Sequence, residues 1–279
     1  MRLPAALVPL VCLAAAAAPQ ALAPVAAPAF RWTGTPTQGG LIAGTVPAGS
    51  VAVTLDGQPV AVEAGRFIAG FDRDAGAQAM LVATLADGRR ITQPLAVAPR
   101  AWRIERLNRL PKFPAPDPVM AQLRPAELAQ IAAARAQVTD ATGWRQTVRW
   151  PAIGRISGLF GAQRIYRGEP GSYHSGIDIA RPTGTPVVAP ADGVVILAAD
   201  HPFTLEGNLL MIDHGHGLNS AFLHLSRIDV RVGDHVRQGD PIGAVGATGR
   251  ATGPHLHWSL RWRDARLDPL LVAGAMPGV

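Results

Sequence analysis

The chain has 279 residues, of which 48% are hydrophobic and 16% charged. Such a chain can bury a core and is not expected to be disordered, while its 30 Gly and 25 Pro favour turns and short strands over long helices. Lys112 is the only lysine, so the net charge of +6 comes almost wholly from arginine. An anionic polymer is one partner that suits this charge, and an arginine-rich solvated surface explains it equally well.

Residues 1–23 have the pattern of an export signal. Arg2 precedes an apolar run at 5–18, and Ala21-Leu22-Ala23 fits a cleavage site with small residues. The run is too short to span a membrane comfortably, and no later stretch reaches the required length. We therefore expect an exported protein, periplasmic or associated with the cell wall, without a membrane anchor after cleavage. Nucleic acid is not an expected partner of such a protein.

The single cysteine, Cys12, lies inside this segment. Val11 stands where a lipoprotein would need a small residue, which argues against acylation. The mature chain would then contain no cysteine, which excludes disulfides, thiol catalysis and zinc sites built on cysteine. Any metal site must use His, Asp or Glu.

Two segments, residues 24–38 and residues 39–98, follow the export signal. Residues 24–38 are rich in Ala, Pro and Thr and are expected to form a flexible leader. Residues 39–98 read as short strands, with Asp56-Gly57 and Asp87-Gly88 as hairpin turns. This spacing predicts a small β-sandwich of immunoglobulin type, without a chemical cluster of its own.

Residues 99–149 are expected to be a proline-rich linker and one helix. Pro125 is a suitable first residue for the helix, and Gly143 lies where it could end. Leu128, Ile131, Arg135 and Val138 then fall roughly on one face.

Residues 150–272 again show short strands separated by glycine turns, without a convincing helix. This pattern predicts an antiparallel, barrel-like or split-sheet domain. The whole chain is therefore predicted to be mainly β.

Histidines and an aspartate gather in two strand-like segments of this last domain. His174 and Asp178 are four residues apart, and His255 and His257 are two apart, so each pair shares one face of an extended strand. A catalytic zinc site takes three protein ligands and leaves a fourth position for water. An isolated pair of this kind is more often a set of surface histidines. The joint presence of both pairs, with His224 in a further strand, favours a metal site.

Longer motifs extend this pattern in a fixed order. They are HSGID at 174–178, GTPVVAP at 184–190, IDHG at 212–215, GDPIG at 239–243 and TGRATGPHLH at 248–257. From about residue 153 to 270 the chain resembles the lysostaphin-type (LytM-like) zinc endopeptidases of bacterial cell walls. The preceding β module is similar, more loosely, to the one found in proteobacterial members.

The resemblance implies a role for several residues and a lysostaphin-type, barrel-sandwich-like fold. His174, Asp178 and His257 would bind one Zn²⁺ per chain. His255 and His224 would be the two histidines that assist the reaction without binding the metal, with His255 as the base, although their roles could be exchanged. Tyr173 and Asn208 are candidate substrate-binding residues, for which aromatic packing and a turn are the commoner explanations.

Other patterns carry less chemistry. His214 and His216 flank a glycine in a tight turn and are expected to be structural or solvated. The glycines at 243–249 lack the spacing of a nucleotide-binding loop. Residues 232–243 resemble a lipoyl-carrier hairpin, but no attachment lysine follows Lys112.

The expected function is an exported zinc endopeptidase that hydrolyses the peptide cross-links of peptidoglycan. Its partners would be peptidoglycan stem or cross-link peptides and, in addition, other envelope proteins. Two alternatives stay open. One is a non-catalytic wall-binding protein that activates an amidase, and the other is a peptidase kept latent by the helix and linker that precede its domain.

Overall fold

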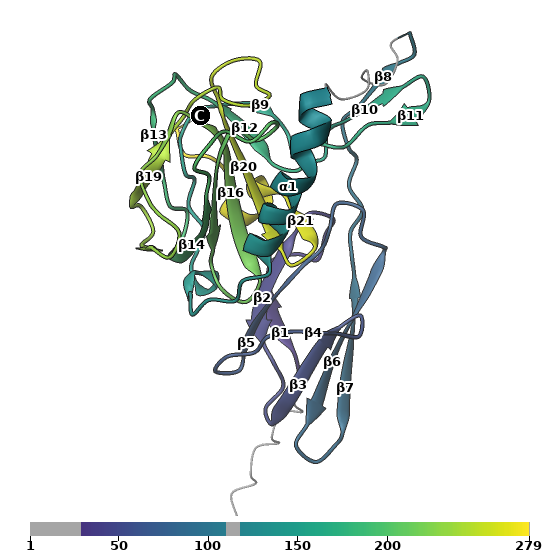
Figure 1. The fold of residues 1–279 in the computed structure, drawn as a ribbon. Helices are drawn as coiled ribbons and strands as arrows, with labels where there is room; N and C mark the ends of the chain where they lie inside the picture. The colour runs from purple at the N-terminus through teal and green to yellow at the C-terminus, as the bar shows by residue number, and fades with distance from the viewer. Residues whose placement is uncertain (1–28, 110–117, 279) are drawn as a thin grey trace, which may run out of the picture.

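The computed structural model describes residues 29–109 and 118–278. The expected signal segment, Cys12 and most of the proline-rich stretch lie outside the described residues. Within them the chain is mostly antiparallel β-structure, which confirms the mainly-β prediction. Figure 1 shows a slender N-terminal sandwich below a larger β-domain that helix α1 crosses.

The N-terminal part folds into two small sheets, with strand orders β1-β2-β5 and β4-β3-β6-β7. Its strands are β1 (Arg31–Thr33), β2 (Leu41–Thr45), β3 (Ser50–Leu55), β4 (Gln58–Pro59), β5 (Arg66–Gly70), β6 (Gln78–Leu85) and β7 (Arg90–Ala96). In β6 every second side chain from Ala79 to Leu85 is buried, the period of a strand with one face on a core. Asp56 and Gly57 both have positive φ, which a tight hairpin of this type requires.

Residues 29–38 differ from the expected flexible leader. β1 pairs with β2, and Phe30 is buried with its ring edge-on to Phe67. The aromatic side chains of Phe30 and Trp32 give this segment enough apolar surface to join the sandwich, which its Ala- and Pro-rich composition conceals. Residues 24–28 lie outside the described residues.

The connection between the two parts contains a strand that the sequence pattern missed. β8 (Ile104–Leu107) runs parallel to β10 (Gln163–Tyr166), which also pairs with β11 (Glu169–Pro170). Close by, Trp102 packs edge-on against Phe160. The linker is thus attached to the C-terminal domain.

Helix α1 (Pro118–Arg135) begins seven residues before the predicted start. Pro118 occupies the favourable first position, and Pro125 lies inside the helix, where its ring removes one backbone hydrogen bond. Ile131 is buried as predicted, but Leu128 is 49% and Val138 96% exposed. The predicted face is wrong because α1 buries Glu127, Ile131 and Ala134 and ends at Arg135, before Val138. The short 3₁₀ helix η1 (Gly143–Arg145) follows.

The C-terminal domain is built on an eight-stranded sheet of order β18-β14-β15-β16-β20-β12-β9, with β21 beside β20, and a three-stranded sheet of order β13-β19-β17. Its remaining strands are β9 (Arg155–Gly158), β12 (Ile177–Ala180), β13 (Pro186–Val188), β14 (Gly193–Ala198), β15 (Asn208–Asp213), β16 (Leu218–Leu225), β17 (Arg227–Ile228), β18 (His235–Val236), β19 (Pro241–Ala244), β20 (Leu256–Trp262) and β21 (Ala265–Leu267). The sequence pattern missed the short helix α2 (Pro269–Ala273), which Asp268 caps through the Leu270 N–H.

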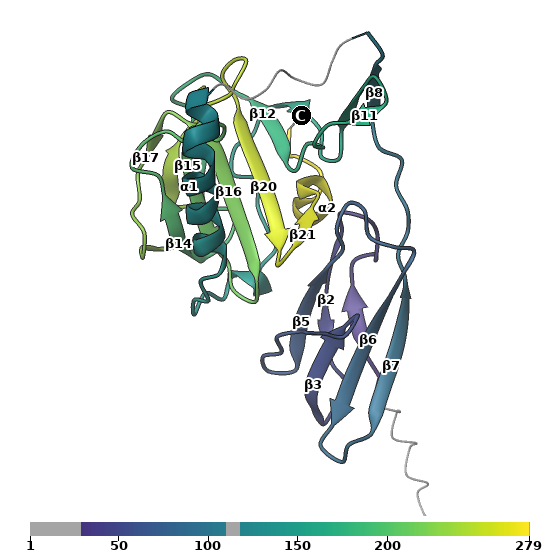
Figure 2. The same cartoon turned by 45° about the vertical axis from the view of Figure 1, so that its right-hand side comes forward.

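Buried polar contacts join the two parts of the molecule, which lie side by side in both views (Figure 2). Asp268, 1% exposed, forms an ion pair with Arg100 at 2.8 Å. The Asp72 carboxylate accepts a hydrogen bond from the Arg266 backbone N–H. A Cβ at Gly70 would stand 2.9 Å from Leu267 Cδ2, so this glycine lets the sandwich approach the β20–β21 hairpin. Among the described residues, no helix combines the length and hydropathy that a membrane crossing requires.

His214 is fully buried, as a structural histidine would be. One ring nitrogen lies 2.9 Å from the Asp192 carbonyl and the other 2.8 Å from Ser220 Oγ. Burial lowers the pKa of His214 from its ordinary 6.5. As the pH falls below 6.5 the unfolded chain therefore binds a proton that the folded chain does not.

We predict that His214 makes the protein less stable in mild acid. Between pH 7 and 5 the free energy of unfolding of the wild type should fall more steeply than that of His214→Gln, by up to the one-proton limit of about 1.4 kcal/mol per pH unit. Urea unfolding at several pH values measures both slopes. Equal slopes would show that His214 is not held neutral by the fold.

Candidate functional site

The site is built on the pairing of β12 with β20. Asp178 in β12 lies directly opposite His257 in β20. In β20 the side chains of Leu256, Trp258 and Leu260 are fully buried in the core. The period of two residues therefore directs His257 to the other face of the sheet. Burial of the apolar side chains on one face of β20 thus determines that His257 projects from the opposite face.

His174 completes a three-residue cluster with this pair. Its Nε2 lies 3.0 Å from Asp178 Oδ1 and 3.0 Å from His257 Nδ1, and the last two atoms are 2.9 Å apart. His174 precedes β12, where its backbone N–H donates to the Ala162 carbonyl. His174, Asp178 and His257 form a group of residues that could hold a metal ion.

The donor set fits a small divalent cation. Three ligands at 2.0–2.1 Å in a tetrahedral arrangement stand about 3.3 Å apart, close to the separations observed. His174 Nδ1 lies 3.0 Å from the Leu159 carbonyl, which can only accept, so Nε2 is left with its lone pair toward Asp178. A metal ion between these atoms, or a proton on His174 Nε2 that donates to Asp178, makes this contact attractive.

Two glycines make room for the cluster. A Cβ at Gly158 would stand 2.1 Å from Asp178 Oδ2, and one at Gly176 2.7 Å from His257 Nε2. Although burial opposes ionisation of Asp178, hydrogen bonds with His174 and His257 hold its pKa below the ordinary value. The cluster is therefore a compact anionic site.

His224 and His255 lie beside this cluster. Their ring centroids are 4.8 Å apart, and His255 Nε2 is 3.7 Å from Asp178 Oδ1. Each ring approaches a backbone carbonyl through Nδ1 at 2.8 Å, His224 that of Thr248 and His255 that of Gly253. A carbonyl accepts only, so Nδ1–H donates in both, and both Nε2 atoms of the neutral rings are acceptors.

His224 occupies an unusual backbone position. Its φ is +64°, at a point where the pairing of β15 with β16 is irregular. Its N–H donates to the Glu206 carbonyl instead of to the neighbouring strand. Burial lowers the pKa of His224 to about 4, so the ring is neutral at neutral pH. The irregularity interrupts the alternation of side chains between the two faces of β16 at His224.

The two candidate substrate-binding residues lie near these histidines but are engaged elsewhere. The Asn208 side chain donates to the Leu225 carbonyl, and the Tyr173 hydroxyl accepts from Arg266. The Tyr173 ring also packs against Phe160 and lies under the Arg73 guanidinium at 4.5 Å. Both side chains are thus bound to other parts of the protein.

The other histidines stay outside the cluster. His216 stacks on Trp144, His201 contacts Asp200 at the surface, and His235 is exposed in β18. Sequence reasoning missed Thr248, whose carbonyl orients His224 and whose hydroxyl accepts from Asn208 N–H. The motif containing Thr248 was visible, but nothing local in it indicates these long-range contacts.

Helix α1 covers the same face of the sheet as the cluster. Ile131 and Ala134 pack in one core with Ala221 and Leu223, and Leu223 is the direct partner of His257 across β16 and β20. At the other end of the helix, Arg124 binds both carboxylate oxygens of Glu206, at 2.5 and 2.7 Å. The helix is thus tied to the loop that supports His224.

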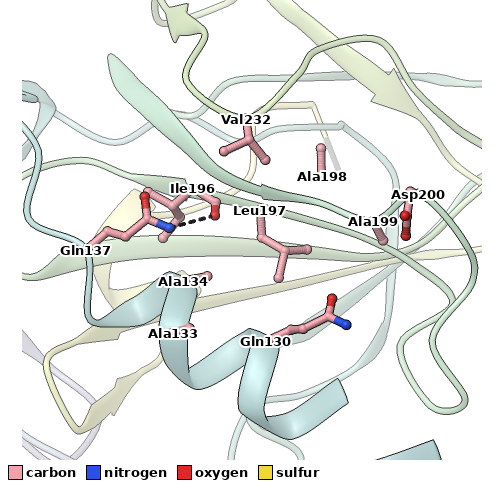
Figure 3. Close-up of a pocket in the computed structure, with 10 residues that line it drawn as sticks. All are labelled: Gln130, Ala133, Ala134, Gln137, Ile196, Leu197, Ala198, Ala199, Asp200 and Val232. Carbon is pink, nitrogen blue, oxygen red and sulfur yellow. Dashed lines mark hydrogen bonds between the residues drawn. The ribbon is translucent and has the colours of Figure 1, made fainter. Parts of the chain in front are cut away.

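A pocket of about 370 Å³ between α1 and β14 lies apart from this site (Figure 3). Its walls are mainly alanine and aliphatic side chains, and Gln137 crosses its edge to donate to the Ile196 carbonyl. Asp200 is its only titratable residue. The pocket lacks the side chains for metal or acid–base chemistry.

Comparison with known proteins agrees with this geometry. Residues 172–269 match the model of peptidase family M23. Peptidoglycan DD-endopeptidase ShyA of Vibrio cholerae is 44% identical over 110 residues, which are 38% of this chain and 24% of that protein. DD-carboxypeptidase/endopeptidase Mpg of Neisseria meningitidis is 42% identical over 127 residues, 44% of this chain and 28% of that protein. The chain thus spans about a quarter of the length of these curated relatives.

One solved structure resembles the chain over nearly its whole length. A crystal structure from Pseudomonas aeruginosa, described as a peptidase M23, is 30% identical with a TM-score of 0.66. The match covers 86% of this chain and 95% of that one, so it includes the N-terminal sandwich as well as the domain that carries the cluster. The chain therefore belongs to peptidase family M23.

Proposed function

We propose that the protein is a zinc-dependent endopeptidase that hydrolyses the peptide cross-links of bacterial peptidoglycan. The observation that carries this proposal is the convergence of His174, Asp178 and His257 on one point, with two further histidines beside it. The names of the relatives, a peptidoglycan DD-endopeptidase and a DD-carboxypeptidase/endopeptidase, support the substrate class.

In this proposal His174 Nε2, Asp178 Oδ1 and His257 Nδ1 would hold one Zn²⁺ per chain. A zinc ion in such a site polarises the scissile carbonyl and lowers the pKa of water to about 7. The hydrogen bond from His174 Nδ1 to Leu159 fixes the tautomer that leaves Nε2 free for the metal. Gly158 and Gly176 keep the space that the ligands need.

His255 and His224 move the protons. Each neutral ring holds a lone pair on Nε2, because Nδ1 donates to a backbone carbonyl. His255 takes the proton of the attacking water and returns one to the leaving amine, a contribution of about 10²–10⁴-fold. His224 Nε2 accepts in the tautomer seen here, so this ring could hydrogen-bond the developing oxyanion only after it has gained a proton. The similar tautomers of the two rings mean that their roles could also be exchanged.

Export to the periplasm or cell wall is part of the same proposal, since the substrate lies there. The signal pattern at 1–23 and the peptidoglycan named for the relatives support it. The alternative of a non-catalytic amidase activator is less favoured, because such a protein has no need for a complete set of metal-binding side chains.

Metal binding is the first prediction of this proposal. Purified protein should bind one Zn²⁺ per chain. Loss of a hydrogen bond that supports a metal ligand weakens metal binding by about 10–100-fold. Asp178→Asn or His257→Ala, which removes a ligand itself, should weaken zinc binding by more than this. Mass spectrometry of metal content and competition with a chelator measure both quantities. His201→Ala, at an exposed histidine, is the matched control. Unchanged zinc content in Asp178→Asn would refute the site.

Substitution of the two flanking histidines separates chemistry from metal binding. His255→Ala and His224→Ala should each lower kcat on purified peptidoglycan by about 10²–10⁴-fold while zinc content stays at the wild-type value. Release of muropeptides, followed by mass spectrometry, gives the rate and identifies the cleaved bond. Loss of zinc from either variant would show that the histidine is a ligand.

The position of α1 supports the alternative of a latent peptidase. Arg124→Ala removes the ion pair between the helix and Glu206, and should raise turnover of polymeric peptidoglycan several-fold by loosening the helix from the face that carries the site. Arg90→Ala, in the N-terminal sandwich, is the control. Equal rates in wild type and both variants would mean that α1 does not restrict the substrate.

A further inference from the structure

A second pocket, of about 820 Å³, lies where the C-terminal end of α1 meets the β15–β16 turn and the β20–β21 hairpin. Ala61 closes it from the N-terminal sandwich. Three arginines line it, Arg135 from the helix and Arg261 and Arg263 from the hairpin. No part of the proposed peptide hydrolysis uses these side chains.

The guanidinium groups in this pocket lack the partners that buried arginines usually have. Within the described part of the chain, Arg135 makes no side-chain hydrogen bond or ion pair, and its Nε–H is buried without an acceptor. The Nε–H of Arg261 is equally buried and unpartnered. Buried N–H groups without acceptors are rare in folded proteins, and a bound water, ion or ligand is one way to satisfy them.

The acidic side chains of the pocket do not neutralise these charges. Asp213 is 6% exposed and accepts a hydrogen bond from the Thr139 hydroxyl at 2.6 Å. Arg261 donates from its terminal Nη2 to the Asp264 backbone carbonyl at 3.2 Å, whereas the fully exposed Asp264 carboxylate lies 3.5 Å away. Arg263 stacks on Trp262 and has no acidic partner among the described residues. Three cationic groups therefore share one cavity with little compensation.

The electrostatic surroundings of Arg135 agree with this geometry. Burial, reinforced by the positive charges of Arg261 and Arg266, lowers the pKa of Arg135 to about 10. The last turn of a helix favours a cation, which explains why an arginine stands at position 135. This preference does not explain why Arg135 of α1 and Arg261 of β20 line the same pocket.

We propose that this pocket is an oxyanion-binding site, in which the guanidinium groups of Arg135 and Arg261 hold a carboxylate or phosphate group of a ligand. A guanidinium offers several N–H donors in a planar fork that matches both groups. The pocket is large enough for more than the bare anion, and Thr139 and Asn219 line it with further polar groups. The proposal does not depend on the peptidase activity.

The place of the pocket suggests how a long ligand would lie. Arg261 and His257 are on the same strand and the same face, four residues apart, which is about 13 Å at about 3.3 Å per residue. A peptide ligand that reached both residues would have to span that distance. A peptide carboxylate and a free inorganic anion both present oxygen atoms that a guanidinium can bind. The experiment below distinguishes these two kinds of ligand.

The test titrates sodium sulfate into the zinc-loaded full chain at ionic strength held constant with sodium chloride. The arginine Nε–Hε resonances of Arg135 and Arg261 in NMR spectra report on the pocket and are separate from any sulfate at the metal. Saturable shifts are expected in the wild type and in Arg90→Gln, a control at an exposed arginine. Binding should be at least about tenfold weaker in Arg135→Gln. Shifts that do not saturate, or equal affinity in Arg135→Gln, would overturn the proposal.

Two further measurements keep the test decisive. Without sulfate, Arg135→Gln should unfold at a temperature no lower than the wild type, because it removes an unpaired, partly buried guanidinium. A lower Tm would show that Arg135 has a structural partner and would contradict the proposal. Acetyl-D-alanyl-D-alanine and its C-terminal amide form the second arm. Binding of the acid but not the amide supports a peptide carboxylate as ligand, binding of sulfate alone supports a free anion, and equal binding of acid and amide contradicts an oxyanion site.

Discussion

The candidate site depends on one cross-strand pair, Asp178 of β12 opposite His257 of β20. The pair is placed by the core on the other side of the sheet, where Trp258, Leu256 and Ile177 are fully buried. A slip of one residue in either strand would turn these large side chains to solvent and the polar pair into the core. The hydrophobic core therefore fixes the positions of two atoms that face each other at 2.9 Å.

Around this pair the chain arranges contacts that suit a bound cation. The Leu159 carbonyl orients His174, and two glycines clear the space beside Asp178 and His257. The adjoining histidines are oriented by carbonyls of the 248–253 loop. The charge of Asp178, the tautomers of the histidines and the space left by the glycines all suit a metal site at the same place. Such consistency is expected of a functional site.

Much of this could be predicted from the sequence. The period of two residues predicts that His255 and His257 share a face, and the order of the motifs brings His174 and Asp178 to them. The position of His224 rests on the resemblance, because its side chain reaches the site only through a backbone irregularity with φ +64°. Local patterns do not reveal such a break, since it depends on the Glu206 carbonyl from another loop.

The parts that could not be predicted are those that tertiary contacts decide. Pro118 and Pro125 are equally good first residues of a helix by local rules, and the contact of Arg124 with Glu206 favours the longer helix. Phe30 joins the sandwich because Phe67 offers it a partner. The cationic pocket is likewise invisible in the sequence, because Arg135 and Arg261 are far apart along the chain.

The most direct test of the central claim is a crystal structure of the zinc-loaded protein with anomalous data at the zinc absorption edge. The account predicts one anomalous peak about 2.0–2.2 Å from His174 Nε2, Asp178 Oδ1 and His257 Nδ1, with His224 and His255 outside bonding distance. A peak held by other side chains, or a well-ordered site of this geometry that takes up no metal, would contradict it.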